Sequence, residues 1–148
     1  MHTYKHILVP IDFSKISEMA AGQAIELAKC YRARVTLLHV VERFPEHLSH
    51  YHMSHEQMEP KEFLIDRAEK DLTDLSARVG IKDAAKEVVL SHHSAKTEIV
   101  RFVESHDIDL IVLGARGRHG LTDLLGGSTA TGVVRVAPCD VFTVRGEN

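Results

Sequence analysis

The segment from Gly114 to Ser128, GARGRHGLTDLLGGS, has glycine and hydroxyl residues in an order suited to holding an anion, and it directly follows the apolar run LIVL at residues 110–113. Glycine lets backbone N–H groups approach an anion without side-chain obstruction, and a helix N-terminus adds unpaired donors with a partial positive charge. Gly117 and Gly127 stand where a loop can wrap a phosphate chain, and Ser128 stands where a helix can begin. The segment therefore predicts a phosphate site, while simple turning of the chain is the alternative role of these glycines.

Composition narrows the class of protein. The chain has 148 residues, with 44% hydrophobic and 26% charged residues, which predicts a single globular domain over residues 1–148. A net charge of -3 without a basic block argues against nucleic acid or an anionic membrane surface as the main partner. No signal peptide or membrane-spanning stretch is recognisable, so we expect a cytoplasmic protein. Cys30 and Cys139 form no metal-ligand pair or disulfide framework, so we interpret both as ordinary thiols, with Cys139 exposed enough to oxidise.

The elements that must position the glycine segment alternate along the chain. Short apolar runs predict strands, and apolar residues at intervals of three and four predict helices. Five strands alternating with four helices predict an α/β fold: a single open, doubly wound, five-stranded parallel sheet of order 3-2-1-4-5 with helices on both faces. The expected strands are residues 6–11, 34–41, 86–90, 109–113 and 141–144, and the expected helices follow Ser14, Pro60, Ser94 and Ser128.

This topology gives the expected place of a ligand. In an open parallel sheet, ligands bind beyond the carboxyl ends of the strands at the point where strand order reverses. In the order 3-2-1-4-5 that point lies between the first and fourth strands, and the loops that follow them contain Asp12 and Gly114. Topology and glycine content therefore predict the same nucleotide site.

Two common phosphate-binding motifs are excluded. The chain has no G-x-x-x-x-G-K-[ST], and no G-x-G-x-x-G follows its first strand. What remains is G-x-x-G, nine residues, then G-S, together with KHILVPID, VTLLHVVE, DLIVLGARG and GSTATGVVRVAPCDVFTVR. Over nearly its whole length the chain resembles the universal stress protein family. That family has members that bind ATP and members that do not, and this glycine pattern, complete here, is the usual mark of the ATP-binding subgroup.

The resemblance implies roles for individual residues. Pro10, Ile11 and Asp12 would lie near the adenosine end of ATP and Val41 beside the adenine, and the phosphates would be surrounded by Gly114, Gly117, Gly127, Ser128 and Thr129. A carboxylate at a strand end can accept hydrogen bonds from ribose hydroxyls, and a cap of the first helix is the alternative role of Asp12. Arg116, with Arg118 and His119, would either neutralise the triphosphate or remain solvated. A Mg²⁺ ion would be held mainly by the phosphates.

Two positions depart from the family pattern. Asp140 stands where members often have proline before the last strand, which puts the geometry of that strand in doubt, and Ser94 stands where they often have glycine. Neither position is expected to touch a nucleotide. An edge strand with open hydrogen-bonding groups favours pairing with a second copy, so we expect a homodimer through residues 141–144.

A histidine-rich stretch, HLSHYHMSH, contains His47, His50, His52 and His55. Imidazole binds zinc, copper and nickel, but this spacing fits no standard zinc pattern and has no completing cysteine. We interpret the stretch as a mobile polar loop that titrates near neutral pH and lies on the ligand side of the sheet as a lid.

The resemblance and the motif together favour an ATP-binding universal stress protein that acts as a nucleotide-dependent sensor or regulator in the stress response. Phosphoryl transfer needs a placed base or water-orienting group, and the motif offers none, so the interpretation is a sensor more than a catalyst. Two alternatives remain: a nucleotide-free dimeric adaptor module, against which the intact glycines argue, and a slow ATPase.

Overall fold

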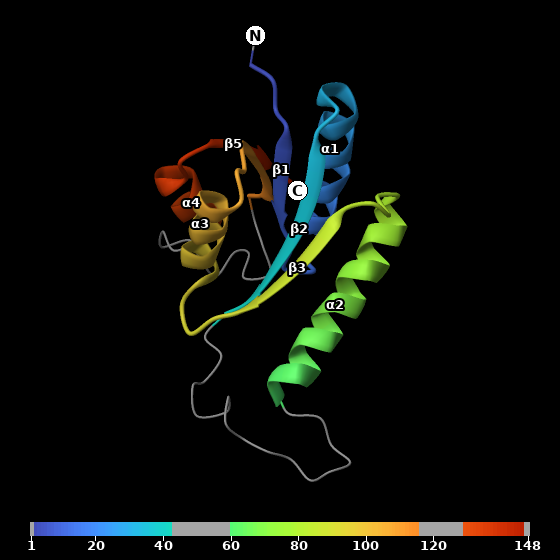
Figure 1. Ribbon diagram of the computed structural model, residues 1–148, viewed down its shortest axis with the longest axis vertical. Helices are drawn as coiled ribbons and strands as arrows, with labels where there is room; N and C mark the ends of the chain where they lie inside the picture. The colour runs from blue at the N-terminus through green and yellow to red at the C-terminus, as the bar shows by residue number, and fades with distance from the viewer. Residues whose placement is uncertain (1, 43–59, 116–128, 147–148) are drawn as a thin grey trace.

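The computed structural model describes residues 2–42, 60–115 and 129–146, and these form one parallel sheet with helices on both faces (Figure 1). The strand order is β3-β2-β1-β4-β5, so the predicted fold and order are confirmed. The strands are β1 (His6–Pro10), β2 (Arg34–Val41), β3 (Ala85–Leu90), β4 (Leu110–Gly114) and β5 (Asp140–Val144). The helices are α1 (Lys15–Tyr31), α2 (Pro60–Val79), α3 (Ala95–Ser105) and α4 (Thr129–Val136).

Successive side chains of the central strands point to opposite faces of the sheet, so the protein has two hydrophobic cores. Ile7 and Val9 of β1 face a core shared with α1 and α2, whereas Leu8 faces a core shared with α3 and α4. Figure 1 shows the two helix pairs on opposite sides of the sheet. Small residues on α1, among them Ala20 and Ala24, are fully buried and let this helix lie close to the strands. Residues 7–9 are fully buried because both faces of β1 are covered.

The last strand is regular despite Asp140. It begins at this residue and pairs with β4 from Leu110↔Asp140 to Gly114↔Val144. The Tyr4 hydroxyl donates to Asp140 Oδ2 at 2.8 Å, so the carboxylate is held at the strand start. The doubt that Asp140 raised about this strand is therefore resolved in favour of an ordinary parallel pairing.

Cys139 is less exposed than expected from the sequence. Cys139 is half-buried, and burial raises the pKa of its thiol to about 11. Cys30, near the end of α1, is the exposed thiol. The core-side position of Cys139 against the α3 and α4 layer accounts for the difference.

At the amino edge of the sheet, where the strands begin, polar groups satisfy one another. His6 is only 7% exposed; its Nε2 lies 2.8 Å from Thr36 Oγ1, and its Nδ1 lies 3.1 Å from the His106 carbonyl oxygen. Because a carbonyl only accepts, Nδ1 carries the proton and Nε2 accepts from the threonine. The Asp109 carboxylate accepts from the backbone N–H groups of Lys5 at 2.8 Å and of His6 at 3.2 Å. No helix in the described ranges has the length and apolar character needed to cross a membrane.

Candidate functional site

The strand order of the sheet reverses between β1 and β4. These two strands pair directly through Ile7↔Leu110 and Leu8↔Ile111. The segments that leave these two strands therefore start side by side at the carboxyl edge of the sheet. Asp12 lies in the first segment and Gly114 ends the strand before the second. Beyond Gly114, the Ala115 N–H donates to the Val144 carbonyl at 2.8 Å, which holds the start of this segment against β5. This is the position at which open parallel sheets bind ligands.

The turn between β1 and α1 is fixed by its own hydrogen bonds. The Ile11 N–H donates to the Leu38 carbonyl at 2.8 Å and continues the pairing with β2. Asp12 Oδ1 accepts from the Ser14 N–H at 2.9 Å, and the Ser14 hydroxyl accepts from the Ser17 N–H at 3.2 Å. Ser14, and not Asp12, is therefore the N-cap of α1. The alternative role of Asp12 as helix cap is wrong, and its carboxylate shapes the turn that precedes the helix.

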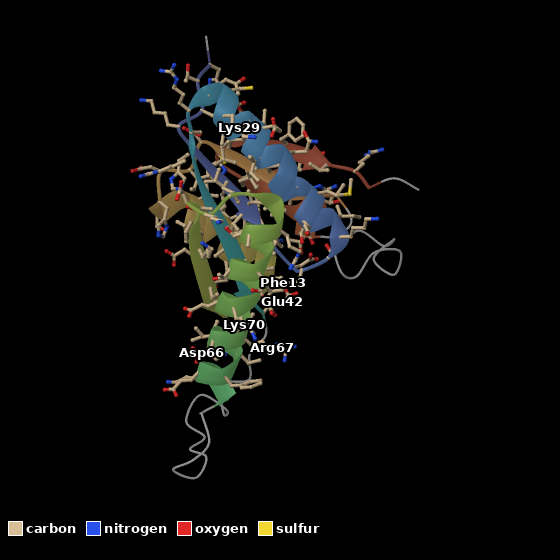
Figure 2. All side chains as sticks on the ribbon, turned by 90° about the vertical axis from the view of Figure 1, so that its right-hand side faces the viewer. Phe13, Lys29, Glu42, Asp66, Arg67 and Lys70 are labelled. Atoms are coloured by element: carbon tan, nitrogen blue, oxygen red, sulfur yellow. The ribbon has the colours of Figure 1, made fainter. Side chains whose placement is uncertain are left out.

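Phe13 and His39 support this turn and were not singled out from the sequence. Phe13 has φ 64°, a left-handed conformation that costs a bulky residue about 1 kcal/mol or more. Its ring centroid lies 4.6 Å from that of His39, and His39 Nδ1 donates to the Ile11 carbonyl at 2.7 Å. The contacts with the β2 side chain hold the strained backbone in place. In Figure 2, Phe13 lies near the middle of the molecule, between Lys29 in the last turn of α1 and the α2 residues Asp66, Arg67 and Lys70.

Val41 ends β2 at the same edge, next to a corner formed with α3. Its carbonyl accepts from the Ser91 N–H at 3.0 Å. The following residue, Glu42, accepts from the Ala95 N–H through Oε2 at 2.9 Å and so stabilises the first turn of α3. This contact fixes the end of β2, and Val41 remains half-buried there.

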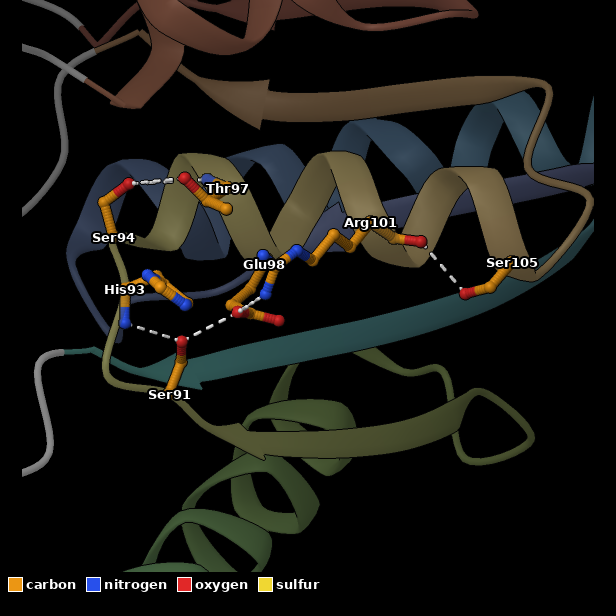
Figure 3. Close-up of polar contacts among 7 residues, drawn as sticks. All are labelled: Ser91, His93, Ser94, Thr97, Glu98, Arg101 and Ser105. Atoms are coloured by element: carbon orange, nitrogen blue, oxygen red, sulfur yellow. Dashed lines mark hydrogen bonds and ion pairs between the residues drawn. The ribbon is translucent and has the colours of Figure 1, made fainter. Parts of the chain in front are cut away.

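A network of side chains completes that corner (Figure 3). The Ser91 hydroxyl donates to Glu98 Oε1 at 2.7 Å and accepts from the His93 N–H at 2.9 Å. Arg101 Nη1 lies 3.0 Å from the same carboxylate oxygen. The third helix begins just after Ser94, as predicted, and Ser94 caps it by accepting from the Thr97 N–H. These contacts join the end of β3 to α3, so the polar groups of this corner bond to one another.

Gly114 has a packing role that the sequence did not reveal. A Cβ at this position would overlap Ile16 Cγ2 and would lie 3.2 Å from the Ile16 carbonyl carbon. Backbone cannot move aside as a flexible side chain does, so the first turn of α1 requires glycine here. This requirement holds whether or not the residue also approaches a phosphate.

Six of the ten predicted site residues fall within the described ranges. Pro10, Ile11, Asp12, Val41 and Gly114 lie at or just beyond the carboxyl ends of β1, β2 and β4, and Thr129 is the first residue of α4. Arg116, Gly117, Gly127 and Ser128 lie outside the described residues, as do Arg118 and His119 and the histidines at 47, 50, 52 and 55. Across the described ranges, no three His, Cys, Asp or Glu side chains are grouped so that they could hold a metal ion.

Comparisons with known proteins find one family, and the similarity extends over almost the whole chain. The model of the universal stress protein family matches residues 3–145. The chain is similar to universal stress protein A homolog 1 of Coxiella burnetii, with 33% identity over 144 residues and 97% of each chain covered. Among solved structures, it is similar to universal stress protein UspA from Lactobacillus plantarum, with 29% identity, a TM-score of 0.72, and 98% of this chain and 100% of that chain covered. It also shares its fold with a universal stress protein solved in complex with cAMP, at 19% identity and a TM-score of 0.71, with 99% and 100% of the two chains covered.

Proposed function

This chain belongs to the universal stress protein family, and from that premise we propose that it binds ATP at the carboxyl ends of β1 and β4. The observation that carries the proposal is that Asp12, Val41 and Gly114 lie at the carboxyl ends of the neighbouring strands β1, β2 and β4, where strand order reverses. The protein solved in complex with cAMP has the same fold, so this fold can hold an adenine nucleotide. The assignment of a nucleotide to this chain rests on Asp12, Val41 and Gly114 and not on the ligand of the similar protein.

The adenosine end is assigned to the β1–α1 turn and the end of β2. Asp12 Oδ1 accepts from the Ser14 N–H, and a carboxylate can accept several hydrogen bonds at once, those of ribose hydroxyls among them. Val41 and Pro10, both half-buried, supply apolar surface for the adenine, and the buried Ile11 holds the turn between them and Asp12 in place. His39 and Phe13 act as positioning residues because they hold the Ile11–Ser14 turn and do not themselves need to contact the nucleotide.

The phosphate end is assigned to the segment that follows Gly114 and to the start of α4. Gly117, Gly127 and Ser128, with Arg116, would present backbone donors, a hydroxyl and a cation, and Thr129 is the first residue of α4. A Mg²⁺ ion would be held mainly by phosphate oxygens. Nucleotide occupancy would then alter the surface at this edge, which makes the protein a nucleotide-dependent sensor or regulator of the stress response.

We also propose a homodimer through β5. This strand is at the edge of the sheet and pairs with β4 on one side. Phe142 on β5 is 43% exposed, and Val134 and Val136 of α4 are 53% and 52% exposed. Pairing of two such strands would satisfy edge hydrogen-bonding groups and cover apolar surface together. Sedimentation analysis of the wild type and of a Phe142→Lys variant tests this, with a dimer expected for the first and a monomer for the second.

Isothermal titration with ATP, with and without Mg²⁺, tests the nucleotide proposal. Any small molecule released from the purified protein by denaturation is identified first, so that a pre-bound nucleotide is not mistaken for absence of binding. Saturable binding of ATP with a Kd below about 1 mM, equivalent to about 4 kcal/mol, supports the proposal. Absence of binding at millimolar ATP, with no nucleotide released, contradicts it and favours the nucleotide-free adaptor.

A further inference from the structure

A hollow of about 570 Å³ lies between α4 and β5, next to the start of the segment that follows β4. Thr131 and Arg135 line it from α4, Thr143 and Arg145 line it from β5 and the residue after it, and Ala115 lines it from the end of β4. Ala115 is thus shared between this hollow and the edge assigned to the nucleotide. The two features are neighbours on one edge of the sheet.

The side chains of the hollow favour an anion. Among the described residues that line the hollow, the charged side chains are two arginines, which are ten residues apart in the chain. The described lining contains no carboxylate. Like charges placed at one hollow repel each other, and an anion between them removes that repulsion. Threonine hydroxyls and guanidinium groups are donors suited to phosphate oxygens, and guanidinium can bind them in a bidentate manner.

The position of the hollow matches the far end of a nucleotide. In the order β2-β1-β4-β5, three strand spacings of about 4.8 Å separate the strand of Val41 from the strand of Thr143, or about 14 Å in all. That span is comparable with an extended nucleoside triphosphate and exceeds a nucleoside monophosphate. We propose that Arg135 and Arg145 bind the outer phosphates of the nucleotide, so that the protein distinguishes triphosphate from monophosphate. The inference rests on the proposed nucleotide function and adds the residues that would determine its specificity.

Titration of the full chain with AMP, ADP and ATP, each with Mg²⁺, tests the inference in an Arg135→Gln/Arg145→Gln variant. Both arginines are exposed, and Gln retains helix propensity at position 135, so the variant is expected to fold. Arg67→Gln is the matched control, because it removes an exposed cation of α2 far along the chain from the hollow. Light scattering records the oligomeric state of each protein.

The wild type is expected to bind ATP about tenfold or more tightly than AMP, and the double variant to lose that preference while its AMP affinity stays within about twofold. The control should behave as the wild type. ATP affinity unchanged in the double variant overturns the inference and leaves the proposed function intact. Loss of AMP and ATP binding together, or dissociation of a dimer, also overturns it, since the arginines would then be structural. A wild type that binds none of the three nucleotides contradicts the proposed function itself.

Discussion

The two edges of the one sheet use polar residues in different ways. At the amino edge, Asp109 accepts from two backbone N–H groups, and the buried His6 ring bridges Thr36 and the His106 carbonyl. At the carboxyl edge, Asp12 holds a turn that includes the left-handed Phe13. The first arrangement joins β1 to β2 and β4. The second keeps a strained turn in place beside the point where strand order reverses.

This difference separates residues that stabilise the fold from residues that we propose take part in nucleotide binding. Backbone strain is retained where surrounding contacts enforce it, which is common at ligand sites. Here His39 enforces it through the Ile11 carbonyl and the Phe13 ring. We therefore expect substitutions at the amino edge to change the free energy of unfolding, and substitutions of Asp12 to change nucleotide affinity.

The largest loss of stability is expected at Gly114. This residue lies at the carboxyl edge but also packs against α1, so it is an exception to the division between a stabilising edge and a binding edge. Gly114→Val should lower the free energy of unfolding by about 3 kcal/mol, since its Cβ would overlap Ile16. Gly22→Ala is the matched control: nothing lies within 4 Å of its Cβ position inside α1, so this change should stabilise the protein by about 0.5–1 kcal/mol. Urea unfolding measures both. Equal stability of the two variants would show that α1 does not pack tightly on β4.

The second prediction compares substitutions of Asp109 at the amino edge and Asp12 at the carboxyl edge. Asp109→Ala removes the acceptor of two backbone N–H groups and should cost about 2 kcal/mol of unfolding free energy, with nucleotide affinity preserved. Asp12→Asn keeps an oxygen for the Ser14 N–H but removes the negative charge and one acceptor oxygen, so ATP affinity should fall about tenfold, with a smaller loss of unfolding free energy than in Asp109→Ala. Unfolding curves and calorimetry on both variants provide the measurement. The division between the edges fails if each variant changes both quantities alike.

The third prediction concerns pH and the amino edge. Burial, and then the charge of Arg34, lower the pKa of His6 in the folded state, although the Asp109 carboxylate and the His106 carbonyl act in the opposite direction. Above about pH 6.5 the ring is neutral in both states and its contribution is fully present. As the pH falls below about 6.5, the unfolded state takes up the proton first, and stability falls by up to about 1.4 kcal/mol per pH unit.

His6→Gln removes this titration while keeping a hydrogen-bonding side chain. Free energies of unfolding measured from about pH 7.5 to about pH 5.5 should decline more steeply for the wild type than for this variant. Parallel pH profiles would mean that His6 is protonated equally readily in both states.

The smallest effect is a difference in thiol reactivity. With a pKa of about 11, Cys139 has only about a thousandth of its thiol ionised at pH 8, and the thiolate is the reactive form. Cys30 is exposed, so mass spectrometry after brief treatment with iodoacetamide should find one rapid modification, at Cys30. Rapid modification of Cys139 would show that the start of β5 opens readily.

The sequence predicted the fold because each signal was local and repeated. Apolar runs marked β1 and β4, helical spacing marked α2, and Ser94 marked the start of α3. Other features depend on where separate elements meet. The His39 contact with Ile11 needs the register of β1 and β2, and the packing role of Gly114 needs the position of α1. Asp12 and Ser14 are both good N-cap residue types, so only the backbone geometry decides between them. The role of the glycine segment beyond Gly114 stays a prediction.

Amide hydrogen exchange with and without saturating Mg²⁺-ATP tests most directly whether the carboxyl edge is the ligand-binding edge. Peptides that cover Ile11–Ser14, Val41–Glu42 and Gly114–Ala115 should become protected when the nucleotide binds. Peptides that cover Lys5–His6 and His106–Asp109 should exchange at unchanged rates. Protection confined to the amino edge, or no protection anywhere at saturating ATP, would contradict the account.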